Sequence, residues 1–262
     1  MTVFLHELRR GRTAFWVWTA SIGLLLLTCM VLYPEMSGQM DGVTELFANM
    51  GGFSAAFGMD RVSFGDVMGF YAIECGNIIG LGGALYAALL GAQALSKEEE
   101  GHTAEFLLTH PISRTRLVAE KLAAVLAQLV MMNALLTLVA YLSFILIGES
   151  PAMPDFALLH LAFTAMQLEI ACIGFAVSSF LRRGNMGIGL GAALLLYFLH
   201  IFSNLSEQAE FLRYITPFAY ADAASVLADG CIELPLLLLG LGYAAVAAVI
   251  AFMIYRRKDI AA

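Results

Sequence analysis

An ionisable side chain in the middle of an apolar stretch is the first feature of this sequence that could do chemistry. Glu169 lies within FTAMQLEIACIGF, two residues after Gln167 and about two helical turns after His160. A carboxyl group in such surroundings is costly, so it normally faces a bundle interior or an aqueous path. Two interpretations remain open: a substrate or proton site, or a protonated carboxyl group that is hydrogen-bonded to a neighbouring helix.

A second polar residue, Asn133, lies within another apolar run. A lone amide there either joins two helices by a hydrogen bond or forms part of a path through the membrane. We therefore group Asn133 with Gln167 and Glu169 as candidate path residues.

Catalytic chemistry is not indicated by the remaining polar residues. An intramembrane protease needs paired aspartates or a Ser/His arrangement, but the six apolar runs contain no aspartate, and His160 and His200 lack a G-x-S-x-G or H-E-x-x-H context. We expect no metal site, because the five methionines between positions 36 and 68 are irregularly spaced and the four cysteines form no C-x-x-C pair. Cys75 and Cys231 either pair at one membrane face or are two small apolar residues.

Composition excludes an ordinary soluble enzyme. Of the 262 residues, 60% are hydrophobic and only 13% are charged, whereas soluble domains have about 25% charged residues. The formal net charge is −7 and no block of basic residues is interleaved with aromatics, so nucleic acid is not an expected partner.

Six apolar runs are long enough to cross a membrane. About 20 residues in a helix span the hydrocarbon layer, where a helix satisfies its own backbone hydrogen bonds. We expect one transmembrane domain over residues 1–262, all α-helical, with membrane lipid as its surroundings. The predicted spans are 14–33, 71–95, 120–147, 156–181, 187–205 and 233–255.

The connecting segments give the direction of the spans. All 14 basic residues except Arg61 and Arg213 fall at the termini or in the loops on one side of the predicted spans. Basic residues in short loops stay in the cytoplasm, so both termini are predicted to be cytoplasmic. The outer stretches 34–70 and 204–233 contain amphipathic pieces that we expect to fold back as re-entrant or interfacial helices, forming a lid over a path.

Two cytoplasmic segments have helical features of their own. Before the first span, TVFLHELRRGR has Phe4, Leu5 and Leu8 on one face, which fits a short interfacial helix or a positive anchor.

Between the second and third spans, residues 96–121 read SKEEEGHTAEFLLTHPISRTRLVAEK. Thr103 is suited to cap a short helix that Pro111 ends, and Ser113 to cap the next helix. The apolar face of the short helix must lie on the membrane or dock into another protein.

The loop 96–121 resembles the first cytoplasmic loop of ABC-2 type ABC transporter permeases. The order on which the resemblance rests is two acidic residues, Gly, Thr, Glu, an apolar pair, Pro, Ser-Arg and Lys: Glu99, Glu100, Gly101, Thr103, Glu105, Leu107, Leu108, Pro111, Ser113, Arg114 and Lys121. The opening HELRR resembles the amphipathic helix at the start of that family, and FLRYITPFAY, with Pro217 and Phe218, resembles its external Pro-Phe segment.

The resemblance implies a type V-like exporter permease fold in a bacterial or archaeal plasma membrane. It implies that a coupling helix docks into a separate cytoplasmic ATPase, present in two copies, and that a second permease half, identical or homologous, completes the path. ATP and Mg²⁺ would be used by the ATPase, since this chain has no G-x-x-x-x-G-K-[ST] motif. By position, the ATPase-coupling residues are Glu98, Glu99, Glu100, Gly101, Thr103, Glu105, Phe106, Leu107, Leu108, Pro111, Ser113 and Arg114, and Pro217 and Phe218 belong to the external lid.

The expected function is therefore a permease subunit that exports a lipophilic or peptide-like substrate and is not itself an enzyme. Two alternatives remain at this point. A secondary carrier or channel would use Glu169 as its ion site and need no ATPase. A scaffold or sensor subunit would bind partners without moving a substrate.

Overall fold

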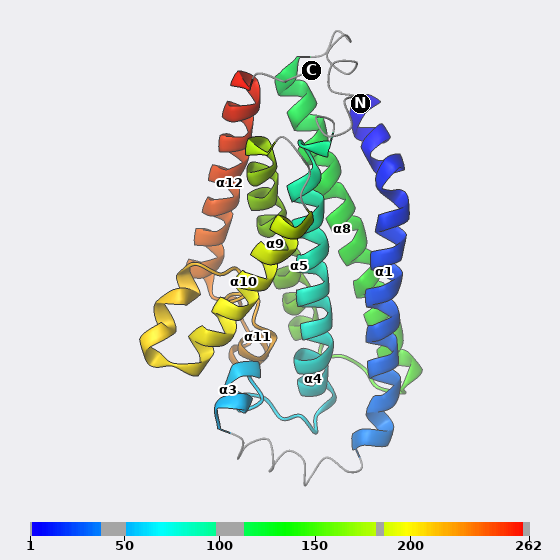
Figure 1. Cartoon of the computed structure of the whole chain (residues 1–262). Coiled ribbons are helices and arrows are strands. Elements are labelled where there is room, and N and C mark those ends of the chain that lie inside the picture. Colours follow the sequence, from blue (N-terminus) through cyan, green and yellow to red (C-terminus); the bar gives the residue numbers. More distant parts are fainter. Residues whose placement is uncertain (1, 38–50, 98–112, 182–185, 259–262) are drawn as a thin grey trace.

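The computed structural model describes residues 2–37, 51–97, 113–181 and 186–258, which form a helical bundle without strands (Figure 1). The coupling-loop residues from Glu98 to Pro111 lie outside these ranges. The described elements are α1 (Thr2–Ser37), α3 (Gly52–Phe57), α4 (Val67–Phe70), the π-helix η1 (Tyr71–Cys75), α5 (Gly76–Gln93), α8 (Arg114–Leu146), α9 (Met153–Phe180), α10 (Met186–Leu205), the 3₁₀-helix η2 (Glu207–Tyr214), α11 (Ala223–Asp229) and α12 (Leu234–Arg257).

Six helical stretches within the described ranges are long and apolar enough to cross a membrane, and each coincides with a predicted span. They are Val3–Ser37, Val67–Gln93, Arg114–Leu146, Met153–Phe180, Met186–Leu205 and Leu234–Arg257. The start of α1 and the end of α12 lie at the same end of the bundle (Figure 1), as an even number of spans requires. The chain is thus a multi-pass membrane protein.

The N-terminal segment differs from the expected interfacial helix. Residues 2–12 continue into the first span as one unbroken helix, α1, of 36 residues. The carboxylate of Glu120 on α8 explains this start, because its Oε2 accepts the backbone N–H groups of Val3 and Phe4 at 3.1 and 3.2 Å. A negative group at a helix N-terminus satisfies free N–H groups and favours the helix dipole.

Helix α9 lies at the centre of the bundle, between α5 and α12 (Figure 1). At the crossing of α5 and α9, a Cβ on Gly91 would lie 2.4 Å from the backbone oxygen of Ala171, so the two backbones approach as only glycine allows. The four-residue spacing of Gly76 and Gly80, and of Gly187 and Gly191, also predicts close approach of helices. That expectation is wrong for Gly191, where a Cβ would meet nothing within 4 Å.

The ends of α1, α5 and α8 are joined by an ion cluster at the end of the bundle that holds the start of α1. Glu7 accepts hydrogen bonds from Lys97 and, at 3.1 Å, from the ammonium group of Lys121, which is 1% exposed. Lys121 also donates to the carbonyl of Ala94 at 2.8 Å. A buried ammonium group requires such compensation, so the cluster fixes the relative positions of three helices.

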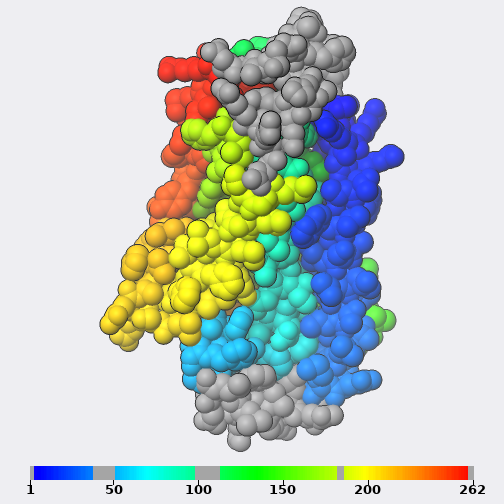
Figure 2. Space-filling model, viewed as in Figure 1, coloured from blue at the N-terminus to red at the C-terminus, as the bar shows by residue number. Residues whose placement is uncertain are grey.

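The opposite end of the bundle carries the short elements α3, η2 and α11. Helices α10 and η2 project from the side of the bundle (Figure 2). Between η2 and α11 the chain turns back into the protein, and residues 216–221 are buried. This burial accords with the predicted re-entrant character of the 204–233 stretch.

Candidate functional site

Glu169 is buried against the re-entrant segment that follows η2. Its Oε2 accepts a hydrogen bond from the Tyr220 hydroxyl at 2.8 Å, and only 2% of Glu169 is exposed. Gly240 of α12 makes room for this pair, since a Cβ there would lie 2.2 Å from Glu169 Oε2. The partner of the intramembrane carboxyl group thus comes from the predicted lid.

Asn133 and Gln167 form a separate interhelical connection. Asn133 Nδ2 donates to Gln167 Oε1 at 2.7 Å, and Gln167 Nε2 donates to the backbone oxygen of Ile79 at 3.2 Å. Both amides are buried and join α8, α9 and α5. The structure therefore brings Asn133 and Gln167 together but places Glu169 on the side of α9 that faces α12.

His160 belongs to a third buried group. The Thr137 hydroxyl donates to the Asn133 carbonyl at 2.8 Å, so at 2.9 Å it accepts from His160 Nδ1. His160 Nε2 then accepts from the Tyr71 hydroxyl at 2.8 Å. A neutral imidazole satisfies both of its hydrogen bonds, to Thr137 and to Tyr71. His160 therefore has a structural role in joining the helices.

Replacing Glu169 with Gln removes the ionisable group but keeps the size of the side chain. The amide oxygen of Gln can still accept from Tyr220, so we expect the free energy of unfolding to change by no more than about 1 kcal/mol, which shifts the melting temperature of the purified chain by at most about 4 °C. If Glu169 lies on the path, transport driven by the assembled complex falls while assembly is retained. Tyr220→Phe is the matched variant, because it keeps the carboxyl group and removes the hydrogen bond. Unchanged transport in Glu169→Gln would leave Glu169 with a structural role.

A polar cavity of about 430 Å³, lined in part by Tyr220, lies at the end of the bundle remote from the start of α1. It is bordered by α10, η2, α11 and the segment before α4. Two arginines line it, Arg61 and Arg213, and Arg213 binds Glu233 at 2.5 Å and Glu210 at 3.5 Å. Carboxylates are in excess among the lining residues that the structure describes, since the acidic ones are Glu207, Glu210, Asp222, Asp229 and Glu233. The cavity therefore favours cations over anions.

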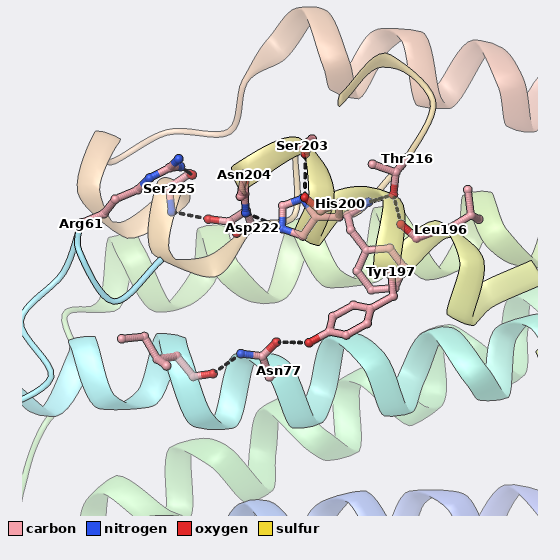
Figure 3. Close-up of polar contacts among 12 residues, drawn as sticks. Arg61, Asn77, Leu196, Tyr197, His200, Ser203, Asn204, Thr216, Asp222 and Ser225 are labelled. Atoms are coloured by element: carbon pink, nitrogen blue, oxygen red, sulfur yellow. Dashed lines mark hydrogen bonds and ion pairs between the residues drawn. The ribbon is translucent and has the colours of Figure 1, made fainter. Parts of the chain in front are cut away.

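Polar side chains from α10 and α11 meet at the wall of this outer cavity (Figure 3). His200 Nε2 lies 2.9 Å from Asp222 Oδ2, and Asp222 Oδ1 accepts the backbone N–H of Ser225 at 2.7 Å, capping α11. The Arg61 guanidinium donates to the Ser225 hydroxyl. Among the described residues, His200 Nδ1 is buried without a hydrogen-bond partner.

The pKa of Asp222 is lowered in the folded protein. Burial alone raises it, but the hydrogen bond and charge of His200, with the Ser225 N–H, outweigh that effect. A carboxyl group with a depressed pKa contributes stability that is complete above its unfolded pKa, about 3.9, and is lost as the pH falls toward the folded value.

We therefore expect Asp222→Asn to lower stability by about 1–3 kcal/mol at pH 7, since it weakens a buried charged hydrogen bond. The difference from the unsubstituted chain should shrink below about pH 4, because Asp222 of the unfolded chain takes up a proton there whereas Asp222 of the folded chain stays ionised. Thermal unfolding of the purified chain at several pH values measures this. A difference that is constant down to pH 3 would contradict the assignment. Asp229→Asn, at an exposed position of the same cavity, is the control.

Pro217 and Phe218, assigned to the external lid by resemblance, lie in the buried part of the re-entrant segment. The Phe218 ring is 5.3 Å from that of Tyr197 on α10, centroid to centroid. Just before them, the Thr216 hydroxyl donates to the Leu196 carbonyl at 2.8 Å (Figure 3). The segment is thus attached to α10, whose tilt sets the position of the cavity.

Of the predicted coupling residues, the structure describes Ser113 and Arg114. The Ser113 side chain accepts the Arg116 N–H at 3.3 Å, which confirms the predicted cap of the following helix. Arg114 donates to the carbonyls of Arg256 and Lys258 at 3.3 and 2.7 Å. The start of α8 is thereby tied to the C-terminal end of α12, where basic groups are favoured.

The cysteines do not form the pair considered from the sequence. All four are free, with Cys75 buried and Cys231 exposed. No group of three or more metal-ligating side chains occurs in the part of the chain that the structure describes.

Sequence reasoning missed Tyr220 and Asp222 as site residues. Asp222 carries a local signal, since an aspartate before Ala-Ala-Ser suits a helix cap. The pairing of Tyr220 with Glu169 has no local signal, because 51 residues separate the two.

Comparison with known proteins gives one family. The family model described as ABC-2 family transporter protein matches residues 1–260. A search of curated proteins finds no match.

Proposed function

Because the chain belongs to the ABC-2 family of transporter proteins, we propose that it is the membrane-spanning permease subunit of an ATP-driven transporter. It is a membrane transport component with six helices that can cross the bilayer. The observation that carries the proposal is the family match over nearly the whole chain together with those six helices. We assign export of a lipophilic or peptide-like substrate, and a plasma membrane location with both termini in the cytoplasm.

We infer that a separate ATPase, in two copies, docks at the cytoplasmic end of the bundle. Its contact is the loop from Glu98 to Pro111, by resemblance. The residues on either side of that loop, Lys97 and Arg114, are attached to other helices. This attachment supports transmission of a movement of the loop to the membrane-spanning helices. Lys97 is paired with Glu7 of α1, and Arg114 is bonded to the end of α12. A displacement of the loop would then move α1, α8 and α12 together.

ATP binding and hydrolysis by the partner would act as a population shift between two arrangements of the bundle. The outer cavity and its re-entrant segment would form the outer end of the path, completed by a second permease half. The buried Glu169 and Tyr220 pair supports a gating role for that segment, since any outward movement of residues 216–221 must break this bond.

The decisive experiment is a mild-detergent pull-down of the tagged chain from its native membranes, with mass spectrometry and an ATPase assay of the eluate. Recovery of a stoichiometric Walker-motif ATPase supports the proposal and reveals whether a second permease chain is present. Recovery without an ATPase would contradict it and favour a gradient-driven carrier that uses Glu169, or a scaffold.

A further inference from the structure

A second cavity lies at the end of the bundle that holds the start of α1. Its volume is about 370 Å³, within the range of roughly 300–1,000 Å³ of small-molecule sites. It is enclosed by α1, α5 and α8, with Met186 of α10 at one border. Arg10 and Ala14 of α1 line it and are exposed, so the cavity reaches the surface of the bundle.

One end of this inner cavity is positively charged. Among the residues that the structure describes, its ionisable lining residues are Glu7, Arg10, Lys97 and Lys121, which are three basic groups and one carboxylate. Glu7 is occupied by the two lysines. Arg10 makes no hydrogen bond or ion pair with another described side chain, although it lies on the same wall. The described lining of the inner cavity is thus mainly basic, and its exposed Arg10 guanidinium group can bind an anion.

The other end of the inner cavity is apolar and aromatic. Trp18 and Tyr86 line it with ring centroids 5.8 Å apart, beside Leu89 and Leu90. The neighbouring surface of α1 exposes Trp16 and Val17, which are 58% and 59% exposed. In a membrane protein such a surface meets lipid, and tryptophan is enriched at the level of the headgroups.

A ligand of this inner cavity must therefore carry an anionic group at one end and an apolar chain at the other. Arginine binds phosphate oxygens through two parallel N–H bonds. Basic pockets between transmembrane helices on the cytoplasmic side are suited to lipid headgroups. The inner cavity meets that description at the membrane level where Arg9, Arg10 and Arg12 precede the first apolar run.

We propose that the inner cavity binds an anionic phospholipid of the cytoplasmic leaflet, with its phosphate at Arg10 and Lys97 and an acyl chain along Trp18 and Leu89. The bound lipid would hold α1 against α5, since Arg10 lies on the first of these helices and Leu89 on the second. The site rests on the proposed orientation, with both termini in the cytoplasm, but not on the assigned ATPase coupling.

The test is native mass spectrometry of the purified full chain, titrated with phosphatidylglycerol or phosphatidylcholine. We expect phosphatidylglycerol to bind more tightly. Arg10→Gln should weaken its binding about tenfold or more, the size of a lost charged hydrogen bond. Arg12→Gln is the matched control, since Arg12 lies two residues further on and does not line the cavity. Equal losses in the two variants, or equal binding of both lipids, would overturn the proposal.

Two further arms distinguish the source of the phosphate and the place of the acyl chain. Inorganic phosphate at millimolar concentration should not displace the lipid, and displacement by phosphate alone would assign the site to a free anion. Ala14→Phe should fill the cavity and block lipid binding, whereas Ala20→Phe, at an exposed position six residues further along α1, should not. Unimpaired binding in Ala14→Phe would also overturn the proposal.

Discussion

Replacing Glu105 with Lys and Phe106 with Asp should release the ATPase subunit from the permease. Both residues belong to the short helix that the loop sequence predicts. The first change reverses a charge and the second places a charge on the apolar face that would be buried in the partner's groove. Leaving a charge unpaired in an interface costs about 2–5 kcal/mol, and two such changes correspond to a loss of at least about 10³ in affinity. Co-purification of the ATPase with the tagged permease measures this loss.

A matched control for the coupling variant exists at the opposite end of the protein. Glu207→Lys with Phe211→Asp makes the same two changes on η2, where both side chains are exposed. We expect this variant to keep the ATPase. Both variants should insert into the membrane in normal amounts. Normal ATPase association in the loop variant, or equal loss in both, would count against the coupling assignment.

Replacing Gly91 with Ala should be among the most destabilising single-methyl additions in this chain. The new Cβ would lie 2.4 Å from the backbone oxygen of Ala171 and 2.9 Å from the backbone nitrogen of Phe175. No rotation of a side chain relieves a contact with backbone, so α5 and α9 must move apart. Overpacking costs about 1–3 kcal/mol, and we expect the upper end of that range, measured as a lowered thermal unfolding midpoint of the purified chain.

Gly191→Ala is the control for this effect, because a Cβ at position 191 on α10 has nothing within 4 Å. It should be neutral or stabilising by up to about 1 kcal/mol, since alanine is the better helix former. The two substitutions add the same methyl group to apolar helices. Equal unfolding midpoints for the two variants would show that the close crossing of α5 and α9 is absent from the protein.

The six helices could be predicted because each depends on a local property, the length of an apolar run. The start of α8 could also be predicted, because Ser113 is a local capping signal. The start of α1 could not, because α1 extends beyond its apolar run with its first N–H groups bonded to Glu120 of another helix. No local pattern encodes that partner.

The candidate site could be predicted only in part for the same reason. Glu169 could be recognised as a candidate because its neighbours in the sequence are apolar. Its hydrogen bond to Tyr220 could not, because it depends on the re-entrant path of residues 216–221. Likewise, Gly187 and Gly191 have the four-residue spacing of a helix contact, whereas the contact at Gly91 depends on the backbone of α9 opposite it. Which glycine meets a neighbouring helix is decided by the packing of the bundle.

The lengths of α1 and α8 have a mechanical consequence. At 1.5 Å per residue, their 36 and 33 residues extend about 54 and 50 Å, whereas the bilayer with its headgroups measures about 40–45 Å. The two helices are joined near their shared end by Glu120 and the Glu7 cluster, so they bend less than either would alone. They form a stiff pair that reaches from the end of the bundle that holds Arg114 to the opposite end, so a small change of tilt at Arg114 becomes a larger displacement at the far end of α8.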